Sequence, residues 1–224
     1  MVKIVTLFVF PLFQRKLYTF NFLLYTIVMD LVKELIPKPQ FVSPTRVLAD
    51  LGLTSGMNVI DYASGAGHWS IAAAKLVAPK GTVLAIENNI DMLNLVKSRA
   101  ELESINNIEI EVMELEKGAS KLARQADLVI VSNILHLIRD KGEFVSKAVE
   151  MVSSKGRLLF IEWVPKKTLF GPPRDLRISE EQVITLFEKA GLHFACTVDA
   201  GIDHFGLVFD HKGEGCDWKQ SPTE

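Results

Sequence analysis

Cysteine is scarce in this chain, whose 224 residues include only Cys196 and Cys216. Neither belongs to a Cys-x-x-Cys pair, so the spacing does not support a thiolate zinc site. Two cysteines also cannot build the disulfide framework of a small secreted domain. We therefore expect a reducing, cytoplasmic setting.

An excess of charge of either sign is also missing. Lysine and arginine total 25 and aspartate and glutamate total 27, which gives a formal net charge of −2. Such a weak field does not attract nucleic-acid phosphates, which argues against a general DNA- or RNA-binding protein. Hydrophobic residues make up 48% of the chain, as in a globular protein with a core. The length fits one domain, or one domain with an appendage.

No apolar run is long enough to predict a membrane span, although residues 1–28 are rich in phenylalanine. Pro11 and the triplet Gln14-Arg15-Lys16 divide this stretch into two runs, each shorter than the ~20 residues that a spanning helix needs. No small-residue cleavage site follows the apolar run. We favour an extension without a role in the fold, with translation starting at Met29. The alternatives are a membrane-surface anchor, which would give peripheral membrane contact, and a true span or signal.

From Met29 onward, short apolar runs alternate with amphipathic stretches. This alternation predicts βαβ units around a parallel sheet. The loop over 199–203 is too short for a helical crossover, so the last two strands should pair antiparallel. We expect a Rossmann-like, doubly wound α/β fold of three layers, with a mostly parallel seven-stranded sheet and an antiparallel C-terminal strand. It should occupy residues 29–212, followed by a flexible tail over 213–224. Strands are predicted over 58–62, 82–87, 108–113, 127–132, 156–164, 192–198 and 205–209, and helices over 70–77, 92–103, 143–152 and 180–190.

Residues that follow the strands form the candidate site, because open parallel sheets bind ligands at the carboxyl ends of their strands. The first predicted strand leads into Asp-Tyr-Ala-Ser-Gly-Ala-Gly over 61–67, and then into a helix. Small residues there let the backbone approach a ligand, and the helix N-terminus offers free N–H groups. Glu87 follows the second strand, 20 residues beyond Gly67, where a carboxylate can accept hydrogen bonds from ribose. A nucleoside cofactor is therefore expected.

The glycine pattern argues against a dinucleotide. Such a cofactor would require Gly-x-Gly-x-x-Gly, whereas residues 65–70 read Gly-Ala-Gly-His-Trp-Ser. Asp61 would also oppose a pyrophosphate, and an acid is better placed beside a cationic cofactor.

At this point the chain resembles the class I S-adenosylmethionine-dependent methyltransferases, and within them the subgroup that methylates ubiquinone and menaquinone precursors. Residues 61–67 match the family's first motif, an acid followed by x-Gly-x-Gly-x-Gly, with Ala63 at the first glycine. The second, third and fourth motifs follow in order at 83–93, 113–117 and 126–136. Glu114 stands where the family usually has Asp.

The resemblance implies S-adenosylmethionine as the cofactor and a role for each matching residue. Gly65 and Gly67 would approach its methionine part, Asp61 would orient its ammonium group, and Glu87 would hold the ribose. The adenine would lie against Glu114 and Leu115, and the sulfonium near Ser132 and Asn133. The complete predicted cofactor set is Asp61, Ala63, Ser64, Gly65, Gly67, Glu87, Asn88, Glu114, Leu115, Ser132 and Asn133.

Some of these residues have simpler explanations. Asp61 and Asn133 could each cap a helix, and Glu114 could be a surface acid. His136 is a candidate general base if the nucleophile is a hydroxyl, although packing against the pocket would also account for it. His193, His204 and His211 lack a ligand-like spacing with acids, so no metal is expected.

The acceptor is less defined. No Asn-Pro-Pro-Tyr or Asp-Pro-Pro-Tyr follows the fourth strand, and no cysteine lies near the motifs, which disfavours methylation of nucleic-acid bases. A small molecule is left, and a pocket from residues 29–51 and 165–177 would suit a lipophilic one through Phe41, Trp163, Leu169 and Phe170. The alternatives are a nicotinamide-dependent oxidoreductase and a non-catalytic S-adenosylmethionine-binding module.

Overall fold

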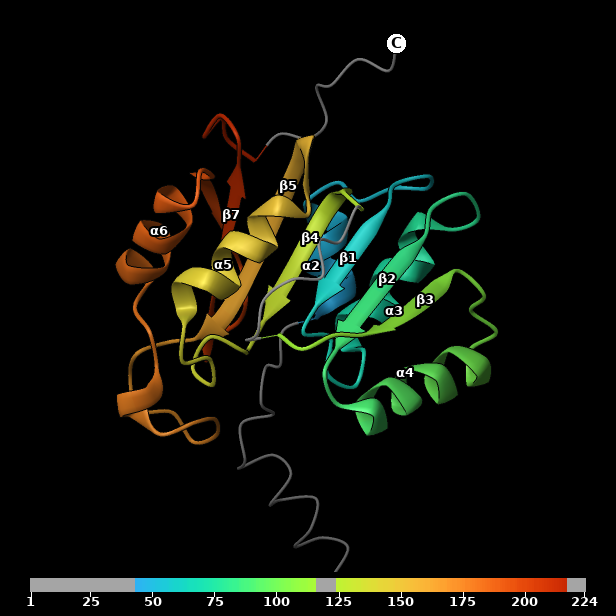
Figure 1. Cartoon of the computed structure of the whole chain (residues 1–224), viewed down its shortest axis with the longest axis horizontal. Coiled ribbons are helices and arrows are strands. Elements are labelled where there is room, and N and C mark those ends of the chain that lie inside the picture. Colours follow the sequence, from blue (N-terminus) through green and yellow to red (C-terminus); the bar gives the residue numbers. More distant parts are fainter. Residues whose placement is uncertain (1–42, 116–123, 217–224) are drawn as a thin grey trace, which may run out of the picture. The chain divides into compact units, whose positions relative to one another are not determined.

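The computed structural model describes residues 43–115 and 124–216. In this part of the chain, seven strands form one sheet in the order β3-β2-β1-β4-β5-β7-β6. Figure 1 shows the strands side by side, with helices in front of the sheet and behind it. The strands are β1 (Val59–Tyr62), β2 (Val83–Glu87), β3 (Ile108–Val112), β4 (Ala126–Ser132), β5 (Val152–Trp163), β6 (His193–Val198) and β7 (His204–Asp210).

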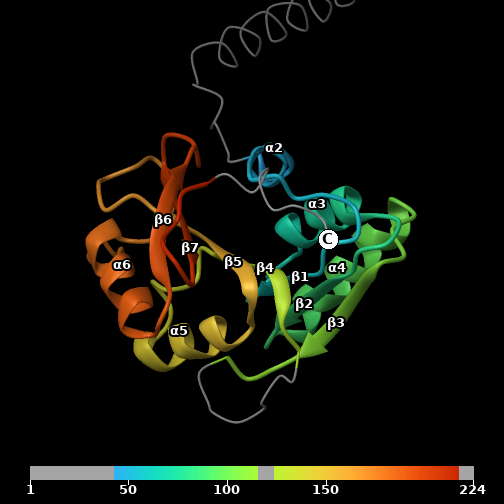
Figure 2. The same ribbon diagram turned by 90° about the horizontal axis from the view of Figure 1, so that it is seen from above.

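Helices cover both faces of the sheet, so the predicted three-layer architecture is confirmed (Figure 2). On one face, α2 and α3 pack on residues such as Val59, Leu128 and Ile161. On the other face, α5 and α6 pack on residues such as Tyr62 and Phe160. The helices are α2 (Pro44–Asp50), α3 (His68–Val77), α4 (Ile90–Leu102), α5 (Lys141–Glu150) and α6 (Glu180–Lys189), with a 3-10 turn, η1 (Arg174–Leu176).

The central strands are buried along their whole length because both of their faces are covered. Every residue of β1 and β2 is buried, whereas the edge strand β3 is only partly buried. β1 pairs in parallel with β2 on one side and with β4 on the other. Strand order reverses at β1, and this reversal places the carboxyl ends of β1 and β4 beside a crevice that can hold a ligand.

The helices begin where side chains cap their first turns. Ser43 caps α2, Asn89 caps α4 and Asp140 caps α5. At α6, Ser179 and Gln182 form a reciprocal capping box. Gly67 begins α3 and has no side chain that could cap it.

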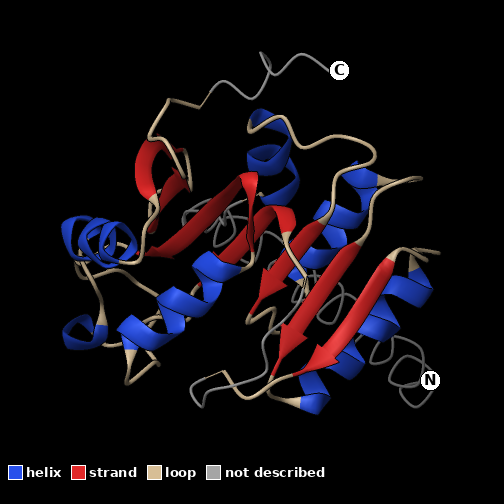
Figure 3. Ribbon diagram, turned by 45° about the horizontal axis from the view of Figure 1, so that its top comes forward, coloured by secondary structure: helices blue, strands red, loops and turns tan. Residues whose placement is uncertain are grey.

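β7 runs antiparallel to both β5 and β6, as predicted (Figure 3). Because of this direction, β7 begins at the edge where β5 ends. His204, the first residue of β7, pairs with Trp163, the last residue of β5. A histidine from the end of the chain therefore reaches the carboxyl edge of the parallel strands.

The two cysteines form a disulfide with each other, which was not expected from the sequence. A disulfide joins Cys196 in β6 to Cys216, with their Cα atoms 5.7 Å apart. The Arg157 side chain donates to the Cys216 carbonyl at 2.9 Å. The disulfide thus ties the start of the predicted 213–224 tail to the sheet.

Other predictions for the chain termini fall outside the structure. Residues 1–28 and the predicted domain start at Met29 lie outside the described residues. Within the described ranges, no helix is both long and apolar enough to cross a membrane.

Candidate active site

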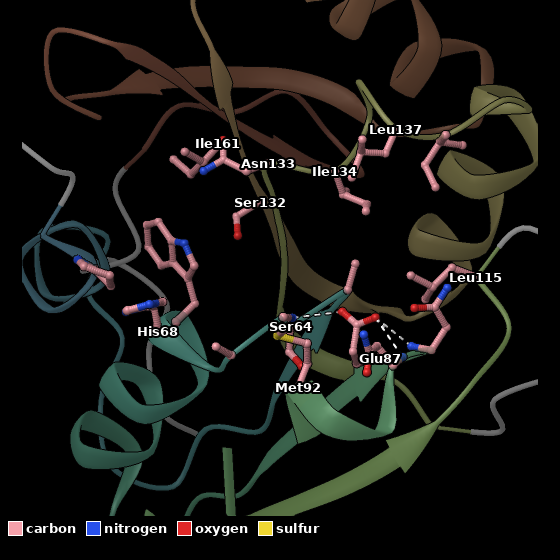
Figure 4. A pocket seen from close by; sticks show the side chains of 18 of the residues that line it. Ser64, His68, Glu87, Met92, Leu115, Ser132, Asn133, Ile134, Leu137 and Ile161 are labelled. Carbon is pink, nitrogen blue, oxygen red and sulfur yellow. Dashed lines mark hydrogen bonds between the residues drawn. The ribbon is translucent and has the colours of Figure 1, made fainter. Parts of the chain in front are cut away.

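A cavity of about 980 Å³ lies at the carboxyl edge of the sheet. Figure 4 shows Glu87 and Ser64 on one side of it, with Asn133 and Ile161 across from them. It is lined by Pro44, Ala63, Ser64, Gly65, Ala66, His68, Trp69, Glu87, Asn88, Asn89, Met92, Glu114, Leu115, Ser132, Asn133, Ile134, Leu137, Ile138, Arg139, Ile161 and His204. The structure thus brings together nine of the predicted cofactor residues, all except Asp61 and Gly67.

The loop after β1 approaches the cavity with its backbone. Gly65 has a φ of 51°, and a Cβ added there would meet nothing within 4 Å. Gly67 has a φ of 78°, and a Cβ there would lie 2.8 Å from the Val96 side chain. Gly65 therefore leaves space on the ligand side, whereas Gly67 permits close packing of α3 against α4. Ala63 has a φ of 66°, which is a conformation that favours glycine.

Glu87 connects the two loops that border the cavity. One of its carboxylate oxygens accepts from the Gly65 N–H at 3.0 Å. The other accepts from the N–H groups of Asn88 at 2.8 Å and Asn89 at 3.1 Å. Its residue exposure is 7%, so it is not a solvated strand-end acid. These three donors fix the carboxylate at the cavity wall, and each oxygen has two acceptor sites, so one site at the first oxygen is still available to a ligand hydroxyl.

Asp61 lies beneath the loop and does not line the cavity. It is fully buried, and its Oδ2 accepts from Ser70 Oγ at 2.5 Å. Its Oδ1 has no hydrogen-bond partner. Burial raises the pKa of Asp61 to about 7, with Glu87 adding to this effect and the hydrogen bonds of Ser70 opposing it. In this structure Asp61 holds the start of α3 through Ser70.

The ends of β3 and β4 supply the other predicted residues. Leu115 is buried, and its carbonyl accepts from the Tyr62 hydroxyl at 3.4 Å. The Asn133 N–H donates to the Ile161 carbonyl at 2.9 Å, and the residue has a φ of 52°. Asn133 Oδ1 and Ser64 Oγ are among the buried polar atoms of lining residues that lack partners in the structure. Unpaired buried polar atoms are costly, and a polar bound molecule would satisfy them.

His136, the predicted general base, is not among the lining residues. Its Nδ1 lies 3.1 Å from an oxygen of Glu162, which is fully buried. That oxygen also accepts from the Trp163 N–H at 3.0 Å. Consecutive side chains of a strand point to opposite faces of the sheet, so the side chains of Glu162 and Trp163 lie on different faces. The catalytic role of His136 stays a prediction. In the structure, the partner of its ring is Glu162.

Several lining residues were not expected from the sequence. Pro44 falls in the predicted acceptor segment 29–51, but Trp163, Leu169 and Phe170 are not lining residues, and Phe41 lies outside the described residues. Trp69, Ile161 and His204 line the cavity instead. The alternation of side chains along the strands could have placed Ile161 on the α2–α3 face. No local pattern marks His204, because it reaches the site through strand order.

The residues present fit a nucleoside cofactor that carries a cationic sulfur. Glu87 offers a carboxylate, the loop at Gly65 leaves open space, and Leu115 offers an apolar surface. Arg99 of α4 donates to the Ala66 carbonyl at 3.0 Å and so holds the loop in place.

Comparisons with known proteins identify the family to which the chain belongs. A family model described as "Methyltransferase domain" matches residues 53–194, more than half of the chain. A methyltransferase structure from Aquifex aeolicus, described as dependent on S-adenosylmethionine, is 25% identical and superposes with a TM-score of 0.69, covering 80% of this chain and 96% of that one. Another from Mesorhizobium loti is 15% identical, covers 73% and 95% of the two chains, has a TM-score of 0.58 and supports the fold alone.

A sequence relative is demethylmenaquinone methyltransferase of Staphylococcus aureus strain JH9. It is 35% identical over 71 residues, which is 31% of this chain and 30% of that protein. The match thus spans less than a third of the curated relative, and what that enzyme methylates does not transfer directly. With the fold, the glycine loop and Glu87 in place, the chain belongs to the class I S-adenosylmethionine-dependent methyltransferase family.

Proposed function

We propose that this protein transfers a methyl group from S-adenosylmethionine to a small lipophilic acceptor. The observation that carries the proposal is Glu87, a buried carboxylate that is fixed by three backbone N–H groups at the wall of the cavity. Its position after β2, next to the loop after β1, suits the two hydroxyls of a ribose.

Other lining residues would each contact one part of the cofactor. Gly65 and Ser64 would lie along the methionine part, and the Ser64 hydroxyl would gain a partner there. Leu115 would pack against the adenine, and Glu114 would accept from its amino group. Asp61 would act indirectly, because it positions the loop and the first turn of α3 rather than touching the ligand.

The cofactor supplies a methyl group that its sulfonium has already activated. The protein's own task is to align the acceptor with that methyl group and to exclude water. Ser132, at the end of β4, lies between Glu87 and the wall that holds Asn133 and Ile161 (Figure 4). This position suits a residue that borders the transfer path.

The cavity lining supports the lipophilic character of the acceptor. Pro44, Trp69, Ile134, Leu137 and Ile161 present apolar surface to the cavity. Burial of an apolar body against these side chains would contribute about 25 cal/mol per Å². Peripheral membrane contact through residues 1–28 would suit such an acceptor and stays a prediction.

The test is the binding of S-adenosylhomocysteine and of its 2′-deoxy analogue by calorimetry. Wild-type protein should bind the parent compound about 10-fold to 100-fold more tightly than the analogue, because a hydrogen bond to a charged group contributes roughly 1.5–3 kcal/mol. Glu87→Gln should reduce this discrimination strongly. Glu111→Gln, a change at a β3 residue outside the lining, is the matched control and should leave discrimination unchanged.

Three results would count against the proposal. A preference for NAD(H) over S-adenosylhomocysteine would indicate an oxidoreductase, and equal discrimination by wild type and Glu87→Gln would remove Glu87 from the ribose site. Tight binding without transfer of label to any metabolite in a whole-cell extract would indicate a non-catalytic binding module.

A further inference from the structure

His204 occupies a fixed position on the far wall of the cavity. It begins β7 opposite Trp163 of β5, and the centroids of the two rings lie 4.1 Å apart. The Trp163 ring is itself held, since the Arg177 guanidinium carbon lies 5.4 Å from its centroid. Arg177 also donates to the carbonyls of Val164 and Phe170, at 3.1 Å in each case. The loop after β5 therefore keeps Trp163, and with it the imidazole, in place.

The imidazole of His204 is buried without hydrogen bonds. The residue is 8% exposed, and neither Nδ1 nor Nε2 has a partner in the described structure. A buried polar group that lacks a partner in the protein often has a bound molecule as its partner or serves a functional role. Since His204 lines the cavity, a molecule bound there is the available source of a partner.

His204 lies on the acceptor side of the cavity rather than the nucleoside side. Glu87, Ser64 and Leu115 come from the ends of β1, β2 and β3, whereas His204 comes from β7 beyond β5. Ile161 lies on the same face of the sheet, and Asn133 donates its N–H to the Ile161 carbonyl. Figure 4 shows Asn133 and Ile161 across the cavity from Glu87. The Asn133 Oδ1 is another buried polar atom on this wall that has no partner.

Burial favours a neutral imidazole at His204. Burial lowers the pKa of His204, and the Arg177 charge acts in the same direction. Glu162 and Asp203 oppose this effect. A neutral imidazole has one nitrogen that donates and one that accepts a hydrogen bond, so it can receive a proton from a substrate.

We propose that His204 is a catalytic residue that binds a hydroxyl group of the methyl acceptor and takes its proton. This inference rests on the proposed methyl transfer and specifies its acceptor class, an apolar molecule that carries a hydroxyl. As the hydroxyl oxygen attacks, a bond forms between that oxygen and the methyl carbon while the bond between sulfur and the methyl carbon breaks. The sulfur keeps the electron pair, neutral S-adenosylhomocysteine leaves, and the proton moves to the imidazole nitrogen. The products are a methyl ether and an imidazolium that returns its proton to water.

The test uses S-adenosylmethionine with a ¹⁴C-labelled methyl group and an organic-solvent extract of whole cells as the acceptor source. Full-length wild-type protein should transfer label to extractable products. Heating these products with hydriodic acid should release the label as methyl iodide, as a methyl ether requires. His204→Phe keeps a ring against Trp163 but has no nitrogen, and it should reduce transfer at least about 100-fold. His204→Gln can still hydrogen-bond and should show a loss mainly in kcat rather than in KM.

Two further measurements separate catalysis from structure. Affinity for S-adenosylhomocysteine should stay unchanged in both variants, and His204→Phe should raise the midpoint of thermal unfolding by about 3 °C because it removes two unpaired buried atoms. His193→Gln, at an exposed residue that begins β6, is the control and should keep full transfer.

The outcomes are distinct. Absence of label transfer by wild-type protein would overturn the proposed function and this inference with it. Normal transfer by His204→Phe, label that hydriodic acid does not release, or a loss of transfer that matches a loss of S-adenosylhomocysteine affinity would overturn the role of His204 alone.

Discussion

Asp61 makes the stability of this protein depend on pH in an unusual direction. Its pKa rises from 3.8 to about 7 in the folded state, because the carboxyl is fully buried. Between these values the folded protein keeps a proton that the unfolded chain has released. A folded state that binds more protons loses stability as pH rises. Asp61 should therefore destabilise the protein progressively from about pH 4 to pH 7.

The size of the effect follows from the shift. At about 1.36 kcal/mol per pKa unit, the raised pKa of Asp61 lowers the free energy of unfolding by at most roughly 4 kcal/mol above pH 7. About 2 kcal/mol of this decrease in unfolding free energy should occur between pH 5 and pH 7. Asp61→Asn mimics the protonated carboxyl, since the amide oxygen can still accept from Ser70. The variant should lack this part of the pH dependence.

The assay is urea unfolding without cofactor at pH 5, 6 and 7. The difference in unfolding free energy between Asp61→Asn and wild type should shift by about 2 kcal/mol in favour of the variant across this range. The other titrating groups are the same in both proteins and cancel. Asp50→Asn, at an exposed side chain of α2, should follow wild type. Parallel pH profiles for wild type and Asp61→Asn would refute the burial argument.

Two other perturbations test the packing around the site. Gly67→Ala should lower the free energy of unfolding in urea by about 1–3 kcal/mol, because the φ of 78° and a Cβ only 2.8 Å from the Val96 side chain both oppose the substitution. Gly65→Ala has open space around it, so it should cost less stability but weaken S-adenosylhomocysteine binding. The reverse stability ranking of the two variants would contradict the geometry. Cys196 and Cys216 are 20 residues apart, so reduction of their disulfide should lower the free energy of unfolding by roughly 3 kcal/mol. The stability of a Cys196→Ser variant should not change with reductant. Equal urea midpoints of the wild type with and without reductant would show that the bond contributes no stability.

The fold could be predicted from the sequence because its central strands are mostly apolar and alternate with helices. The run Leu-Val-Ile-Val within β4 and the short loop before β7 fixed the sheet type and its antiparallel strand. Two features escaped prediction. α2 is only seven residues long, too short for a periodic pattern, and β5 begins at Val152 rather than at Gly156, across a register irregularity opposite Ala126 and Leu128.

The nucleoside half of the site was also predictable, because its residues follow the strands directly in sequence. Glu87 is confirmed as a lining residue at the cavity wall, whereas Asp61 belongs to the same motif and yet points beneath the loop. Motif spacing identifies a residue but does not distinguish a ligand contact from a buried support. His204 could not be found from spacing, since only the order of β5 and β7 brings it to the edge.

The most direct measurement of the central claim is a crystal structure of the complex with S-adenosylhomocysteine. We expect the ribose hydroxyls at Glu87, the adenine against Leu115 and the sulfur facing the wall that holds Asn133 and His204. A nucleoside bound elsewhere, or bound in this cavity with its ribose away from Glu87, would contradict the account.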